Sequence, residues 1–208
     1  GEIGPGYYYP TSAPAIIGDN AVVGGWVFDS QKTDSPSGVV RAFNMKTGTL
    51  AWAWDLGRTE TSDTYTRGTP NTWAPMSVDE ALGLVYVPTG NAAPDYYGAQ
   101  RSADSERYSS SVVALDGRTG AVRWSFQTVH HDVWDYDVPA QPTLIDIMRG
   151  EERVPALLQA TKTGKLFVLD RRTGEPIVDV TEQPVPRDGA PGERLSPTQP
   201  FSTGLPSL

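Results

Sequence analysis

Apolar and polar residues alternate along three similar segments of the chain. These segments are VVRAFNMKTGTLAWAW (39–54), SVVALDGRTGAVRWSF (111–126) and KLFVLDRRTGEPIVDV (165–180). In each, an alternating run leads to an Asn or Asp, then to a Thr-Gly pair, then to a second alternating run. A period of two is typical of strands with one buried face, and Gly supplies the positive φ that a tight turn requires. Each segment is therefore predicted to form a β-hairpin.

A tryptophan follows the turn glycine in the first two hairpins. Trp52 and Trp124 hold this place, whereas Val178 holds it in the third hairpin. We expect the indole rings to pack between neighbouring sheets, where so large a ring buries much apolar area. One such motif can arise by chance, but three copies with matching flanks indicate a structural repeat.

Two further apolar runs precede each hairpin. They cover residues 14–18 and 21–28, then 73–78 and 82–90, then 140–147 and 154–161. Each unit therefore has two strands followed by a hairpin, and four-stranded repeats of this kind are typical of a β-propeller. Because a propeller closes with roughly four to eight blades, we expect the sequence to be part of a longer protein.

The predicted fold is all-β, a propeller of four-stranded antiparallel blades. The blades are expected at about 11–57, 71–128 and 139–182, and residues 183–208 are expected to lead to the next blade. The chain has 208 residues with 38% apolar residues and six Trp, which is enough for a packed core. With 21 Gly and 18 Pro, many turns are expected.

Charge and cysteine content exclude several classes of function. The net charge of −8 argues against a nucleic-acid partner, which would require clustered Lys and Arg. The absence of cysteine excludes disulfides and thiolate metal sites. No run of 18 apolar residues occurs, so no membrane-spanning helix is expected within this stretch.

The stretch HHDVWDYDVPAQPT (130–143) gathers most of the chemically active side chains, including both histidines of the chain. His130 and His131 are adjacent at an expected strand end, so their side chains diverge and should not bind one metal ion together. We expect one of them to point inward and to bond Asp132 or nearby backbone. A zinc site would need three or four converging ligands. We interpret the stretch as the floor of a pocket at the propeller axis.

A family resemblance rests on these motifs together. The complete repeat from Ala114 through Asp116 to Trp124 resembles the tryptophan-docking motif of quinoprotein dehydrogenase propellers. Residues 71–98, 127–147 and 160–176 resemble the pyrroloquinoline quinone (PQQ) dehydrogenases, above all the membrane-bound glucose dehydrogenase branch, which also contains quinate-type enzymes. The resemblance covers essentially the whole chain and implies about three blades of an eight-bladed propeller.

The resemblance implies three roles at the cofactor. Asp135 falls at the place of the catalytic base, where a carboxylate can take the hydroxyl proton of the substrate. Lys162 falls where the family places a catalytic, cofactor-binding cation beside the quinone oxygens, which stabilises developing negative charge. Trp73 matches the tryptophan on which the flat cofactor stacks. From the residues alone, a strand-end aspartate, a solvated turn lysine and a core tryptophan remain open alternatives.

The resemblance also implies a metal site. Asn91 matches the amide ligand of calcium, Asp29 falls near the position of an acidic ligand, and Asp135 is expected to contact the same ion. Hard oxygen ligands suit Ca²⁺, and Mg²⁺ as well, and the metal would polarise a quinone carbonyl. Ordinary turn chemistry is the alternative for Asn91 and Asp29. A departure is Ala93, where the glucose branch can carry a threonine.

The implied function is that of a PQQ-dependent dehydrogenase that oxidises a sugar or polyol, with glucose the expected substrate and ubiquinone the expected electron acceptor. Quinate, shikimate or a simple alcohol is the alternative substrate. A non-catalytic quinoprotein-like propeller that acts as a scaffold is the alternative class. The intact protein is expected in the periplasm, anchored to the inner membrane through segments outside this chain, and the fragment alone is expected to be inactive.

Overall fold

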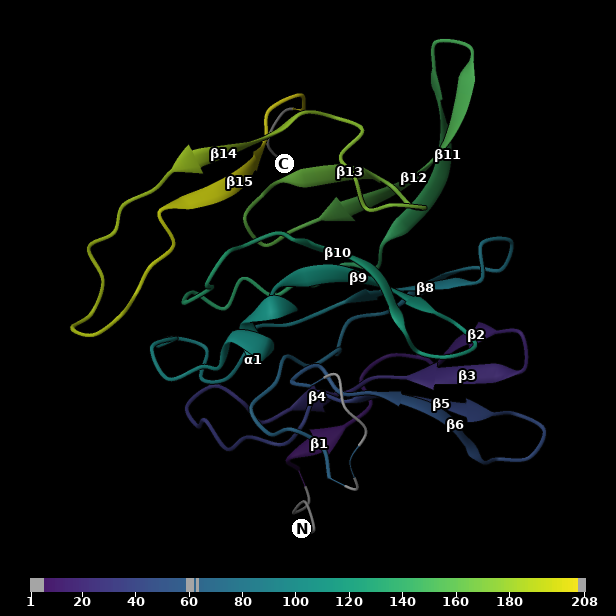
Figure 1. Ribbon diagram of the computed structural model, residues 1–208, viewed down its shortest axis with the longest axis horizontal. Helices are drawn as coiled ribbons and strands as arrows, with labels where there is room; N and C mark the ends of the chain where they lie inside the picture. The colour runs from purple at the N-terminus through teal and green to yellow at the C-terminus, as the bar shows by residue number, and fades with distance from the viewer. Residues whose placement is uncertain (1–5, 59–61, 63, 206–208) are drawn as a thin grey trace.

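The computed structural model describes residues 6–58, 62 and 64–205. Strands dominate this part of the chain, and its one α-helix is the short α1 (Ala103–Arg107). No helix in the described ranges is long and apolar enough to cross a bilayer. Figure 1 shows the sheets stacked one after another in the order of the sequence. The predicted all-β fold is confirmed, and the predicted antiparallel four-stranded sheets are present in the first two units.

The first two sheets each contain four antiparallel strands that neighbour one another in chain order. The first sheet consists of β2 (Ala15–Ile17), β3 (Asn20–Val23), β5 (Val40–Asn44) and β6 (Leu50–Trp54). The second consists of β7 (Ser77–Asp79), β8 (Leu84–Pro88), β9 (Ser111–Asp116) and β10 (Val122–Gln127). Both predicted hairpins are present, as β5–β6 and β9–β10.

The predicted strand over 21–28 is interrupted. β3 ends at Val23, and the residues after the break form β4 (Trp26–Val27), which pairs with β1 (Tyr8–Tyr9). Gly24 lies at the break, where a Cβ atom would stand 2.4 Å from the carbonyl oxygen of Thr72. This close approach of two backbones explains why glycine occupies the position and why the strand does not run through it.

The third sheet differs from the expected four-stranded blade. It contains β11 (Thr143–Arg149), β12 (Glu152–Ala160) and β13 (Leu166–Asp170), and only an isolated bridge between Leu169 and Pro176 marks the place of a fourth strand. Pro176 has no amide hydrogen to donate to a ladder.

The segment after Pro176 pairs elsewhere. β14 (Val180–Pro184) pairs with β15 (Thr198–Ser202) in a separate two-stranded sheet. The expected connection (183–208) therefore includes the end of β14 and all of β15, and the hairpin over residues 180–202 lies at one side of the stack (Figure 1).

The second sheet is buried on both faces because its strands alternate between two cores. On β8, Val85 and Val87 belong to the apolar cluster shared with the first sheet. Leu84 and Tyr86 belong to the cluster shared with the third sheet. Successive side chains of a strand point to opposite faces, so a central blade needs apolar residues at every position of its inner strands.

The Thr-Gly turns have the predicted chemistry. Gly48, Gly120 and Gly174 have φ values of 72°, 74° and 78°, which glycine adopts without steric cost. The side-chain oxygen before each turn accepts backbone amides, as Asp116 Oδ1 does from Arg118 N at 3.0 Å and from Thr119 N at 2.9 Å. Asn44 Oδ1 accepts the same two bonds at the first turn, whereas at the third turn Asp170 Oδ1 accepts only from Arg172 N, and Thr173 N donates to the Asp170 carbonyl.

The second and third turns, at Gly120 and Gly174, also receive the tryptophan of the preceding sheet. Trp52 Nε1 donates to the carbonyl of Gly117 at 3.0 Å, and Trp124 Nε1 donates to that of Arg171 at 3.2 Å. A Cβ atom added to Gly120 or Gly174 would lie 2.5 Å from the respective indole ring. The expectation that these rings pack between neighbouring sheets is confirmed, and the turn glycine is required by contact as well as by φ.

Candidate functional site

The loop between β10 and β11 carries Asp135 and has an unusual backbone. Asp135 has a φ of 60°, in the left-handed region that non-glycine residues seldom adopt. Asp is among the few residues that tolerate this conformation. Positive φ at a non-glycine residue is found preferentially at functional sites, where the surrounding structure holds it in place.

Asp137 is the hub of the polar contacts around this loop. Its carboxylate accepts bonds from Trp73 Nε1 at 3.0 Å, from the backbone N–H of Asn91 at 2.6 Å and from Lys162 Nζ at 3.2 Å. These three partners come from three separate segments of the chain. Sequence reasoning did not assign Asp137 a role. Its position two residues after Asp135, on an alternating D-Y-D run, was the available signal.

Lys162 lies beside both aspartates. Its ammonium donates to the Asp135 carbonyl at 2.8 Å and stands 3.4 Å from Asp135 Oδ1 and 5.9 Å from the centroid of the Trp73 ring. Burial lowers the pKa of Lys162, but the negative charges and hydrogen bonds of Asp137 and Asp135 outweigh burial and raise it. The side chain is therefore a fixed cation at neutral pH.

A pocket of about 380 Å³ opens beside this cluster. Its aromatic wall contains Trp26, Phe28, Trp73 and Tyr96, and its acidic wall contains Asp29, Asp95, Asp135 and Asp137. The structure thus brings together Asp29, Trp73 and Asp135 at one pocket and places Lys162 in contact with its acidic wall.

The acidic wall holds more negative charge than the described residues neutralise. Burial, followed by the charge of Asp137, raises the pKa of Asp29 to about 7. Burial, followed by the charge of Asp29, raises the pKa of Asp95 to about 8. Burial and the charge of Asp137 raise the pKa of Asp135 to about 6, against the opposing effect of Lys162. Carboxyl groups that raise one another's pKa in a pocket are typical of functional sites.

Asn71 adds a further oxygen to the same pocket. Its Nδ2 donates to Asp29 Oδ2, while its Oδ1 is buried and has no hydrogen-bond partner. An unpaired buried acceptor is costly unless a ligand or ion satisfies it. Across residues 6–58, 62 and 64–205, however, no three Asp, Glu or His side chains are close enough together to hold a metal ion by themselves. The pocket offers oxygen donors of the kind that Ca²⁺ prefers, but not a complete site.

Asn91 lies next to this pocket without lining it. Its side chain is buried, with Oδ1 accepting from Ser109 Oγ at 3.0 Å and Nδ2 donating to the carbonyls of Asp95 and Asp132 at 3.0 and 3.1 Å. The side chain therefore links two loops in this structure, and its role as a metal ligand stays a prediction.

The two histidines have separate partners, as the adjacent positions predicted. His131 Nε2 lies 2.7 Å from Glu193 Oε1, and its Nδ1 lies 3.4 Å from Glu106 Oε2. His130 Nε2 lies 3.0 Å from Glu182 Oε1. The expectation that one histidine side chain bonds Asp132 or nearby backbone is wrong, because the ring nitrogens lie against side chains of Gln127 and of glutamates outside the loop. Hydrogen bonding to Glu106, opposed by burial, raises the pKa of His131.

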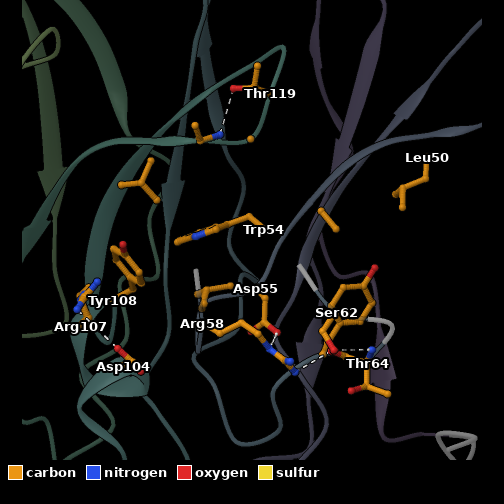
Figure 2. Close-up of a pocket in the computed structure, with 16 residues that line it drawn as sticks. Leu50, Trp54, Asp55, Arg58, Ser62, Thr64, Asp104, Arg107, Tyr108 and Thr119 are labelled. Atoms are coloured by element: carbon orange, nitrogen blue, oxygen red, sulfur yellow. Dashed lines mark hydrogen bonds and ion pairs between the residues drawn. The ribbon is translucent and has the colours of Figure 1, made fainter. Parts of the chain in front are cut away.

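A larger cavity of about 580 Å³ lies between the first two sheets and α1. Figure 2 shows Trp54 next to Tyr108, with ring centroids 5.2 Å apart, and Arg58 bonded to Asp55. None of the side chains predicted to bind cofactor or metal lines this cavity. The candidate site is therefore the smaller acidic pocket.

Comparison with known proteins places these features in a family. The family model described as the glucose/ethanol/alcohol dehydrogenase β-propeller domain of PQQ enzymes matches residues 1–208. A solved structure, the quinohemoprotein alcohol dehydrogenase from Comamonas testosteroni, is similar with a TM-score of 0.70 and 25% identity over 94% of this chain and 31% of that one.

Similar sequences carry several substrate names. The glycerol dehydrogenase large subunit of Gluconobacter oxydans is 51% identical over 100% of this chain and 29% of its own length. The quinoprotein glucose dehydrogenase of Escherichia coli is 48% identical over 95% of this chain and 26% of its own length. The quinate/shikimate dehydrogenase (quinone) of Acinetobacter baylyi is 41% identical over 95% of this chain and 25% of its own length. The chain thus spans less than a third of these relatives, and it belongs to the PQQ-dependent dehydrogenase β-propeller family.

Proposed function

We propose that the complete protein oxidises a hydroxyl group of a sugar or polyol with PQQ as cofactor. Relatives named for glycerol, glucose and quinate support a hydroxyl-rich substrate. Glucose is the substrate proposed from the sequence resemblance, and glycerol is its main competitor. Ubiquinone as electron acceptor, a periplasmic location and a membrane anchor outside this chain belong to the same proposal.

The observation that carries the proposal is the contact between Asp135 and Lys162 at the mouth of an aromatic pocket. The Asp135 carboxylate lines the pocket, and Lys162 Nζ lies 3.4 Å from it. With a pKa of about 6, the Asp135 carboxyl is ionised at neutral pH yet more basic than an ordinary aspartate. This is the protonation behaviour that a general base requires.

The residues of the pocket suit the cofactor and its metal by their chemistry. Trp73 offers a flat aromatic face, and Lys162 offers a fixed cation for a planar anionic molecule. Asp29, Asp135 and the unpaired Oδ1 of Asn71 would contribute oxygens to Ca²⁺ or Mg²⁺, with further ligands from outside the described residues. Asn91 remains a proposed ligand on the family resemblance alone.

Within this arrangement each side chain has a defined task. Bound PQQ would accept the hydride, and so both electrons, from the carbinol carbon. Asp135 takes the hydroxyl proton as the carbonyl product forms. Lys162 holds the Asp135 backbone through its carbonyl and keeps positive charge next to the reacting atoms. Trp73 closes one side of the pocket, with its own ring fixed through Asp137.

The test is dye-linked oxidation by the complete protein reconstituted with PQQ and calcium, using glucose, glycerol, quinate, shikimate and ethanol. Asp135→Asn preserves shape and tolerates the left-handed φ, so it is expected to lower kcat by at least about 100-fold while retaining cofactor binding, measured as quenching of tryptophan fluorescence. Asp188→Asn, on the exposed β14–β15 loop, serves as the matched control.

Two outcomes would count against the proposal. Unchanged kcat in Asp135→Asn would remove this residue as the base. Absence of any quenching by PQQ in the wild-type protein would favour a propeller that acts as a scaffold.

A further inference from the structure

A buried aspartate organises the loop that presents Asp135. The side chain of Asp132 is fully inaccessible to solvent, and its carboxylate accepts three hydrogen bonds. Oδ1 accepts from the amide of Trp134 at 2.9 Å, and Oδ2 accepts from the amide of Tyr136 at 2.7 Å and from Ser110 Oγ at 2.7 Å.

The two amides bonded to Asp132 flank Asp135. Trp134 N belongs to the peptide group between Val133 and Trp134, and Tyr136 N belongs to the one between Asp135 and Tyr136. Because both are fixed to one carboxylate, the backbone of Trp134 and Asp135 is held at both ends. These bonds support the φ of 60° at Asp135, a conformation that residues other than glycine seldom adopt. The Asp135 side chain itself is then free to point into the pocket.

Asp132 is also tied through its backbone to the loop that carries Asp95, another residue of the acidic wall. Its carbonyl accepts from Arg101 Nη1 at 2.6 Å and from Asn91 Nδ2 at 3.1 Å. The same two side chains donate to the carbonyl of Asp95, at 3.2 and 3.0 Å. Because the Arg101 side chain is fully buried, these bonds form a rigid link between the loops that carry Asp95 and Asp135.

We propose that Asp132 is a positioning residue for the reaction: it fixes the conformation in which Asp135 meets the substrate hydroxyl, without itself touching substrate or cofactor. The inference rests on the proposed role of Asp135. It differs from a general structural role because the amide bonds of Asp132 fix the backbone before Trp134 and after Asp135.

The test compares Asp132→Asn and Asp132→Ala in the complete protein. An Asn side chain has one acceptor oxygen, so it loses at least one of the two amide bonds, and Ala loses both. Amide hydrogen exchange at Trp134 and Tyr136 is expected to accelerate at least about 10-fold. Since misplacement of a catalytic group by about 1 Å can cost roughly 100-fold, kcat should fall by about that factor in the Ala variant and less in the Asn variant.

Two readouts separate positioning from a loss of stability. KM and the fluorescence quenching by PQQ are expected to stay within about threefold of wild type, because Trp73 and Lys162 are unchanged. Asp116→Asn is the matched control, since Asp116 also caps a turn with its carboxylate and Asn44 does the same at the first turn. This control should leave exchange at Trp134 and kcat at wild-type values.

A milder variant keeps the inference testable if the Asp132 variants do not fold. Ser110 has a φ of 45°, so Ser110→Gly removes its hydroxyl bond to Asp132 without adding strain. It is expected to lower kcat by about threefold with KM unchanged.

The inference is overturned if the amides of Trp134 and Tyr136 stay protected in Asp132→Ala, or if that variant keeps wild-type kcat despite fast exchange. If the Asp132 variants do not fold, wild-type kcat in Ser110→Gly overturns it. Failure of the underlying function gives a different pattern, because Asp135→Asn would then also retain full kcat.

Discussion

Replacing Asp29 with Asn is expected to stabilise the metal-free protein at alkaline pH. In the native protein, burial and the neighbouring Asp137 hold the pKa of Asp29 at about 7, against 3.8 in the unfolded chain. Between these values the native state binds more protons than the unfolded state, so the free energy of unfolding falls as pH rises through the native pKa. Asn does not titrate, and it can still accept the bond from Asn71 Nδ2.

The size of this effect follows from the pKa. A rise from 3.8 to about 7 corresponds to about 4 kcal/mol at 1.36 kcal/mol per unit. Asp29 keeps part of its surface in water, and screening reduces the expected gain to about 2 kcal/mol at pH 8. The gain should vanish near pH 4. Because the charge of Asp29 also raises the pKa of Asp95, the variant should show a weaker overall pH dependence.

Urea unfolding followed by tryptophan fluorescence, in EDTA at pH 5 and pH 8, measures this difference. Asp188→Asn removes the same charge from an exposed loop and is expected to leave the pH dependence unchanged. If the free energy of unfolding falls equally in Asp29→Asn and wild type between pH 5 and pH 8, the pKa of Asp29 is not raised by burial and by Asp137.

Two further substitutions test the scaffold and the cation. Trp124→Ala removes the indole that packs on the Gly174 turn, so urea unfolding should show a loss of about 3–5 kcal/mol, and a loss below about 1 kcal/mol would contradict the docking role. Lys162→Met removes the cation beside Asp135 and Asp137, so kcat/KM in the dye-linked assay should fall at least about 100-fold, and unchanged turnover would contradict its role.

Local patterns predicted most of the fold because each blade is specified by short-range features. Alternation placed the hairpins, and the Thr-Gly turns with Trp52 and Trp124 placed the sheets against one another. The third sheet lacks a fourth strand, and its sequence differs from the other two units at the same place: Pro176 follows the turn, and Val178 replaces the tryptophan. The pairing of β14 with β15 joins two short, mostly polar strands across a long connection (185–197), which periodicity does not identify.

The site was predicted in part for a similar reason. Trp73, Asp135 and Lys162 carried recognisable motifs, and they meet around Asp137. Asp137 itself was overlooked because its importance lies in three contacts from separate segments, and a sequence does not display convergence of that kind. Asn71 has the same property, since only the folded chain reveals its unpaired oxygen.

The central claim is that Trp73, Asp135 and Lys162 surround one cofactor-binding pocket. A crystal structure of the complete protein with PQQ and calcium tests it most directly. The account predicts a planar density against the Trp73 ring, within hydrogen-bond distance of Lys162 and next to the Asp135 carboxylate. Cofactor bound at another cavity, with these three side chains arranged as they are here and the acidic pocket free of it, would contradict the account.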